Sequence, residues 1–225
     1  MSRRMLRMVA LVVCWLTELG AAESVVVGPN LVLNGTFEHA DAADAKRPQG
    51  WARPDGMGVC WLPAPFGASG KAISMDTAVS EKRMMEHWAE VGITDWNIPK
   101  ASNDPVAATY GLSYYSQAFP IEAGKAYRVS VSFHGAGAKI WVRGYGLLTH
   151  GDVTETRRLY EAVAELTPSE NGWAVTTHDF NPTKHTPKVT EMKVMLFGYW
   201  PPGVKWFRDV EVRALSADAA ESAAK

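Results

Sequence analysis

Apolar and polar residues alternate in short runs through most of the chain, which is the pattern of β-strands with one buried face. Clusters of Gly, Pro, Asn and Asp separate these runs and provide turns. We predict strands over residues 30–33, 59–62, 71–75, 113–121, 127–134, 139–145, 157–166, 173–180, 191–198 and 206–212. Many short strands between regular turn signals predict an all-β sandwich or barrel.

One segment departs from the β pattern. Its large apolar side chains fall at helical spacing, at Met84, Met85, Trp88 and Val91. Ser80 is placed to cap a helix start and Gly92 to end it, so we predict a short helical insertion at residues 80–92. It lies inside a long insertion between strands, residues 76–110, which either covers one open end of the fold or has a function of its own.

The two ends of the sequence differ from the rest. Three arginines precede an uncharged apolar run at residues 8–16, and small residues follow at 20–22, which predicts a signal peptide over 1–22. The run is shorter than the ~20 residues that cross a bilayer, so we expect no membrane span. We expect a bacterial protein that is secreted or periplasmic, with one domain at 23–215 and a polar, disordered tail at 216–225.

Composition excludes several classes of function. The 225 residues suffice for one domain with a sizeable core, and 23 basic against 24 acidic residues give none of the basic excess of a nucleic-acid-binding surface. Cys60 is the only cysteine after the predicted signal peptide, so no internal disulfide is expected. The histidines lack metal-ligand spacing, and no nucleophile elbow, phosphate loop or dinucleotide motif is present.

The alternation is clearest over residues 127–146. One set of positions is apolar and belongs in a core, while the other set holds Arg128, His134, Trp141, Arg143 and Tyr145 among serines. We predict an antiparallel hairpin that turns at residues 135–138, which would bring both strands' polar sets onto one face.

That face has the chemistry of a sugar-binding surface. Flat aromatic rings stack on sugar C–H groups while donors at their edges meet hydroxyls. We therefore predict ligand binding by Trp141, Tyr145, Arg143, Arg128 and His134. Two alternatives stay open: the face packs beneath the 76–110 insertion or meets solvent, or the turn aromatics of residues 199–202, with Trp173, form a separate sugar site.

Three stretches, in order, carry a family resemblance. Residues 30–38 read Asn-Leu-Val-Leu-Asn-Gly-Thr-Phe-Glu, followed by Gly50-Trp51; residues 117–127 read Gln-Ala-Phe-Pro-Ile-Glu-Ala-Gly-Lys-Ala-Tyr; residues 204–212 close with Arg-Asp-Val-Glu-Val. Together they resemble carbohydrate-binding modules of the galactose-binding-like jelly-roll fold. The resemblance implies a β-sandwich jelly roll that binds a poly- or oligosaccharide on its concave sheet face, without catalysis, in the service of a larger enzyme or cell-surface partner.

The same resemblance implies a structural calcium ion. Residue by residue, its carboxylate ligands transfer to Glu38 and Asp209, with backbone carbonyls completing the six to eight oxygens that calcium prefers. Arg208 occupies the first of two aspartate positions in the family pattern. It provides an alternative, in which an Arg208–Glu38 salt bridge replaces the ion.

Two other functions stay open. A jelly-roll polysaccharide lyase acting on a uronic-acid polymer would need a base, such as His134 or Tyr145, and an arginine, Arg128 or Arg143, to neutralise the uronate. An adhesive or structural module without a sugar ligand would use its aromatic loops against a protein.

Overall fold

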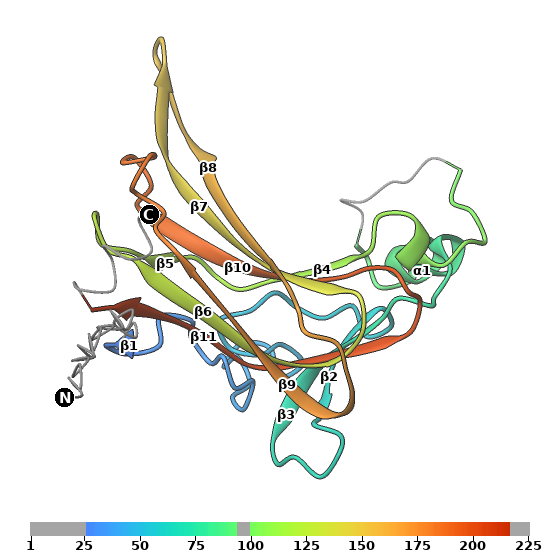
Figure 1. The fold of residues 1–225 in the computed structure, drawn as a ribbon. Helices are drawn as coiled ribbons and strands as arrows, with labels where there is room; N and C mark the ends of the chain where they lie inside the picture. Colours follow the sequence, from blue (N-terminus) through green and yellow to red (C-terminus); the bar gives the residue numbers. More distant parts are fainter. Residues whose placement is uncertain (1–25, 94–99, 217–225) are drawn as a thin grey trace, which may run out of the picture.

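The computed structural model describes residues 26–93 and 100–216, and within them two antiparallel sheets pack face to face as a jelly-roll β-sandwich (Figure 1). The first sheet has the order β2 (Val59–Pro63), β3 (Lys71–Asp76), β11 (Val204–Leu215), β6 (Tyr127–Gly135) and β9 (Ser169–Phe180), with β1 (Val26–Val27) beside β11. The second has the order β4 (Leu112–Tyr115), β10 (Glu191–Gly198), β7 (Ala138–His150) and β8 (Val153–Glu165), with β5 (Phe119–Pro120) beside β10. The predicted all-β sandwich is confirmed.

The predicted ends of the chain fall largely outside this description. The signal peptide at residues 1–22 lies outside the described residues, as does the tail after residue 216. In the described part, no helix is long and apolar enough to cross a membrane.

The predicted hairpin between β6 and β7 is wrong. β6 pairs with β11 and β9 in the first sheet, whereas β7 pairs with β10 and β8 in the second. The chain crosses between the sheets at residues 135–137, where Gly135 and Gly137 have φ values of +119° and +69°. A Cβ on Gly137 would overlap the carbonyl oxygen of Trp200, so only glycine fits this crossing.

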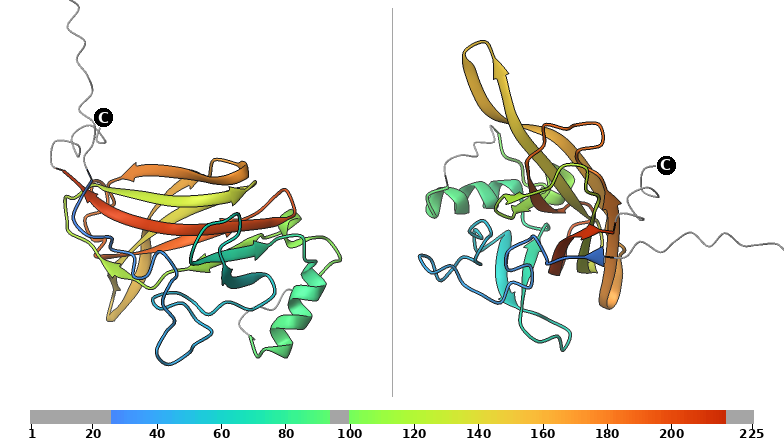
Figure 2. Two further views of the ribbon diagram at one scale, coloured as in Figure 1. Left: turned by 90° about the horizontal axis from the view of Figure 1, so that it is seen from below. Right: turned by 90° about the vertical axis from the view of Figure 1, so that its left-hand side faces the viewer.

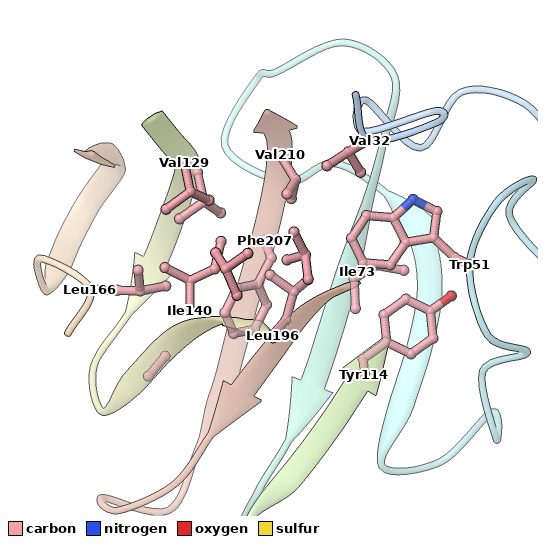
Figure 3. Close-up of a cluster of buried hydrophobic side chains, with 14 of the residues drawn as sticks. Val32, Trp51, Ile73, Tyr114, Val129, Ile140, Leu166, Leu196, Phe207 and Val210 are labelled. Atoms are coloured by element: carbon pink, nitrogen blue, oxygen red, sulfur yellow. The ribbon is translucent and has the colours of Figure 1, made fainter. Parts of the chain in front are cut away.

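The core lies between the sheets and is built from the apolar set of each strand. Val129 and Phe207 of the first sheet face Ile140 and Leu196 of the second, and all four are at most 1% exposed (Figure 3). At one side, the rings of Trp51 and Tyr114 stack with centroids 5.6 Å apart. Burial of each such side chain stabilises the fold by about 1.5–3 kcal/mol, so this layer holds the two sheets together.

The predicted helix is confirmed as α1 (Glu81–Glu90), followed later by the 3-10 turn η1 (Val106–Ala108). Ser80 Oγ accepts a hydrogen bond from the backbone N–H of Arg83 at 3.3 Å, as expected of a helix cap. Met84 and Trp88 are buried in the main core, so α1 closes one end of the sandwich.

The prediction of a strand at residues 30–33 is wrong, because hydrogen bonds from the Asn30 side chain take the place of backbone pairing between strands. Asn30 Oδ1 accepts hydrogen bonds from the backbone N–H groups of Val32 (3.0 Å) and Val212 (2.9 Å), and its Nδ2 donates to Val210 O (3.0 Å). This clamp fixes an irregular segment against β11. The single strand predicted at 113–121 is likewise divided, into β4 and β5.

Strands β7 and β8 are longer than predicted and form a hairpin that extends beyond the rest of the sandwich (Figures 1 and 2). β10 pairs with β7 only as far as Tyr145, so residues 146–157 have no strand partner other than each other in the described structure. The hairpin bends away from the first sheet, so the backbone of β7 follows a curved course (Figure 1).

Candidate functional site

The outer surface of the second sheet carries a continuous set of aromatic and cationic side chains. Because side chains alternate along a strand, the positions between the buried ones point outward. We call this set the aromatic face: Tyr115 of β4, Lys193, Met195 and Phe197 of β10, and Lys139, Trp141, Arg143 and Tyr145 of β7. Its residues are half-buried, apart from Met195, which is 3% exposed and lies in register between Tyr115 and Trp141.

Arg143 joins the centre of the aromatic face. Its Nη1 donates to the Tyr115 hydroxyl at 2.9 Å, and its guanidinium carbon lies 5.4 Å from the Trp141 ring centroid. Its Nε lies 2.9 Å from Glu161 Oε1 on β8. These contacts fix a guanidinium beside two rings, an arrangement that gives a ligand a flat apolar surface with donors at its edge.

Two more cation–ring contacts lie on either side of this centre. Lys193 Nζ is 5.5 Å from the Tyr145 ring centroid, and Lys139 Nζ is 5.0 Å from that of Tyr199. Tyr199 also donates a hydrogen bond to Glu165 Oε2 at 2.6 Å, and this bond raises the pKa of Tyr199 to about 12. Burial raises the pKa of Tyr145, so both phenols stay protonated at neutral pH.

The structure divides the five predicted ligand-binding residues between two surfaces. Trp141, Arg143 and Tyr145 share the aromatic face, as their spacing predicts. Arg128 and His134 lie on β6, on the outer surface of the opposite sheet. The prediction of one common face is therefore wrong for these two residues, because β6 and β7 do not form a hairpin.

Arg128 and His134 are also engaged by other groups. Arg128 Nε and Nη2 lie 2.7 and 2.9 Å from the two carboxylate oxygens of Asp179 on β9, a bidentate pair within the first sheet. His134 Nδ1 donates to the carbonyl of Gly172 at 2.7 Å, and its ring centroid lies 3.9 Å from that of Phe66. Both residues bind neighbouring segments of the first sheet.

The two predicted calcium ligands make contacts of their own. Glu38 Oε1 accepts a hydrogen bond from the backbone N–H of Lys71 at 3.2 Å. Asp209 accepts from Arg208 Nε at 2.8 Å and from the Ser132 hydroxyl at 3.3 Å. Among the described residues, no three His, Cys, Asp or Glu side chains gather closely enough to hold a metal ion.

These contacts fit a calcium cage poorly, because Arg208 already neutralises the Asp209 carboxylate. Arg208 pairs with Asp209 and donates to the carbonyl of Ser69 at 3.2 Å, so the alternative Arg208–Glu38 bridge is not the pair that forms. The calcium site stays a prediction, and the contacts favour an arginine as the local cation.

Sequence reasoning missed part of the aromatic face. Tyr115, Lys193 and Phe197 were within predicted strands, but their faces were not assigned. The alternation of buried Val194 and Leu196 with half-buried neighbours contains that signal. Assigning inward and outward positions along every predicted strand would have found all three residues.

No protein-family model and no curated protein matches this sequence. Several solved structures are similar in fold. "Family 16 Carbohydrate Binding Module-2" has 13% identity and a TM-score of 0.43, covering 81% of this chain and 99% of that one. TmCBM61 in complex with β-1,4-galactotriose has 16% identity and a TM-score of 0.40, covering 82% and 98%. The CBM22-1 xylan-binding domain of Paenibacillus barcinonensis Xyn10C has 10% identity and a TM-score of 0.42, covering 86% and 99%. Likenesses at this level assign no ligand to this chain.

Proposed function

We propose that this protein is a secreted, non-catalytic carbohydrate-binding module that holds a poly- or oligosaccharide on the aromatic face. The observation that carries the proposal is the central set of Trp141, Arg143 and Tyr115, with Tyr145 and Lys193 beside it. The surface is half-exposed, aromatic and supplied with fixed donors.

The physical argument concerns preorganisation. A saccharide has apolar C–H faces and many hydroxyls, so it gains most from rings that are already positioned and from donors that need no reordering. The hydrogen bond from Arg143 to Tyr115 and the ion pair with Glu161 fix the central donors before binding. The row of outward residues from Lys139 to Tyr145 along β7 is long enough for more than one sugar unit of a chain to contact the sheet.

The test is retention on insoluble cellulose, xylan and chitin and on immobilised pectin, followed by affinity measurement on the best ligand. Trp141→Ala removes the central ring and is expected to weaken binding at least about tenfold, which is the loss of one good stacking contact. Trp141→Phe keeps a flat ring and removes an indole N–H that has no hydrogen-bond partner among the described residues, so it should bind within about threefold of the wild type.

Arg128→Gln is the matched control. It removes an arginine from the opposite sheet, so polysaccharide retention should stay at the wild-type level. Thermal unfolding of every variant separates lost binding from lost folding. Equal retention of the wild type and of folded Trp141→Ala on every polysaccharide would contradict the proposal.

The lyase alternative loses half of its predicted residue set, one candidate base and one candidate arginine. His134 and Arg128 lie on the opposite sheet from Arg143, and the remaining candidate base, Tyr145, has a pKa raised by burial. A lyase would produce ultraviolet-absorbing unsaturated sugars from a uronic polymer, so an absorbance assay with pectate tests this alternative directly. Retention without new absorbance supports a binding module.

Partners follow from the same proposal. A polysaccharide is the expected ligand, and the expected partner is a larger enzyme or a cell-surface assembly that the module holds on this polysaccharide. If every polysaccharide and a glycan array give no binding, an adhesive or structural module that contacts a protein becomes the better interpretation.

A further inference from the structure

A cavity of about 670 Å³ lies beside β2, and no residue of the aromatic face lines it. Its lining comes from residues 45–56, from β2, from Lys71 of β3 and from Val91 and Ile93 just after α1, and these segments lie on one side of the sandwich (Figure 2). Its volume falls within the range of about 300–1,000 Å³ that is typical of small-ligand sites.

The cavity lining is rich in cations. Lys46, Arg53 and Lys71 line it against one acidic residue, Asp55. Within the described ranges, no ion pair joins Lys46 or Lys71 to an acidic side chain, whereas Arg53 Nε lies 3.2 Å from Asp44. Asp55 Oδ1 accepts hydrogen bonds from the backbone N–H groups of Met57 and Val59 at 2.7 and 3.1 Å. The lining therefore has an excess of positive charge with two lysines available to a ligand.

An ordered indole lies within this charged lining. Trp61 Nε1 donates to the carbonyl of Phe37 at 2.8 Å, which fixes the ring on β2. Lys71 Nζ lies 3.5 Å from the Trp61 ring centroid. A flat ring with an ammonium held over it provides both an apolar contact and a charge for one ligand.

A second, smaller cavity of about 270 Å³ shares lining residues with this site and with the aromatic face. Arg53, Asp55 and Ile93 line both cavities, and Tyr115 lines the smaller one. Tyr115 also receives the hydrogen bond from Arg143 at the centre of the aromatic face. The smaller cavity therefore lies between the cavity beside β2 and the aromatic face.

We propose that the cavity beside β2 binds an anionic sugar unit, carrying a carboxylate or a sulfate, of a glycan whose neutral part lies on the aromatic face. Only the placement of the neutral part on the aromatic face rests on the proposed function. Charge selection comes from Lys46, Arg53 and Lys71, and Trp61 supplies the apolar contact that a sugar ring needs.

Calorimetry with defined oligosaccharides tests the proposal. The probes are trigalacturonate, its fully methyl-esterified form, which has the same sugar rings without the charges, and a sulfated galactose trisaccharide. We expect the wild type to bind at least one anionic probe, with the ester at least about tenfold weaker and with affinity falling as salt rises. Preference for trigalacturonate identifies a carboxylate sugar, and preference for the galactose derivative identifies a sulfate ester.

The double variant Lys46→Gln/Lys71→Gln should lose about tenfold or more in affinity for the anionic probe. Lys82→Gln/Lys188→Gln is its matched control, because it removes the same charge from exposed lysines outside the cavity lining. The proposal is overturned if neither anionic probe binds, if the ester binds equally well, or if both double variants lose affinity alike.

The outcomes for the two sites are separable. Trp141→Ala should leave binding of the short anionic probe within about threefold, because Trp141 does not line the cavity. Lys46→Gln/Lys71→Gln should still be retained on a neutral polysaccharide. Failure of only one of these binding activities identifies which of the two proposals is wrong.

Discussion

Lys205 is a charged side chain in the core of the first sheet, and it is only 1% exposed. Its Nζ donates to the Thr77 hydroxyl at 2.9 Å and to the carbonyl of Pro201 at 2.7 Å. Burial lowers the pKa of Lys205 to about 8, because the ammonium loses water that two oxygens replace only in part. This residue therefore couples the stability of the fold to pH.

The sign of the coupling follows from the proton balance. Between pH ~8 and ~10.5 the unfolded chain keeps the Lys205 proton while the folded chain releases it, so this residue makes the free energy of unfolding rise with pH. A shift from 10.5 to about 8 corresponds to roughly 3 kcal/mol. Lys205→Met should remove this contribution and leave unfolding less favoured at pH 7 than in the wild type.

Urea unfolding at pH 7 and pH 10 measures both effects. Tyrosines whose pKa values are raised by partial burial, such as Tyr110 at about 12, lower stability at high pH in either protein, so the comparison is the difference between wild type and variant. Lys188→Met, at an exposed position, should behave as the wild type. An identical pH dependence for Lys205→Met would contradict the argument.

The β7–β8 hairpin is the element least supported by the rest of the fold. Beyond Tyr145, β7 pairs only with β8, and Leu147 and Val153 are each 62% exposed. A two-stranded ribbon gains little stability alone in water.

Replacing residues 147–156 by Asn-Gly should therefore leave the melting temperature within about 4 °C of the wild type, equivalent to roughly 1 kcal/mol. Val142→Ala, in the paired part of β7 and 1% exposed, is the positive control and should unfold at a clearly lower temperature. A large loss of stability in the shortened protein would show that the distal hairpin packs against the body.

How far elements can be predicted from sequence is clearest at β6 and β7. Alternation gave the inward and outward residues of both strands correctly, because it depends only on which side faces the core. It gave the wrong partner, because a chain that crosses to the opposite sheet presents the same alternation as a hairpin. The distinction lay in the 135–137 segment, where Gly137 fits against the Trp200 carbonyl, a contact between residues distant in sequence.

Helix α1 shows the opposite case. Its cap, its apolar spacing and its end are all local, and Ser80 and Gly92 act as predicted. Asn30 lies between these cases. Its local sequence is compatible with the start of a strand, and only the position of β11 shows that its side chain accepts a hydrogen bond from Val212 instead.

At the scale of the whole molecule, the pairing of Arg208 with Asp209 bears on ion dependence. An arginine at 2.8 Å supplies the positive charge that the family resemblance assigns to calcium. We expect EDTA to leave the melting temperature of the wild type unchanged. A clear fall on chelation, reversed by calcium, would contradict this expectation and support an ion at Glu38 and Asp209.

Arg208→Asp provides the matched variant. It frees the Asp209 carboxylate and restores an acidic pair, so its melting temperature should rise when calcium is added, in contrast to the wild type. A calcium-dependent rise in melting temperature only in Arg208→Asp indicates that Arg208 replaces the ion. A rise in both proteins indicates that calcium binds beside Arg208.

The pairing of β1 with β11 has a mechanical consequence. Val26 lies opposite Leu215 and Val27 opposite Ala214, so the two ends of the described chain leave the sandwich side by side. Tension applied between them would break the two paired positions of β1 and β11 one after the other. The rest of β11 would stay in place, because β3 and β6 pair with it on both sides. The described fold would therefore yield first at the β1–β11 pair under tension, while the sheet that carries the aromatic face kept its shape.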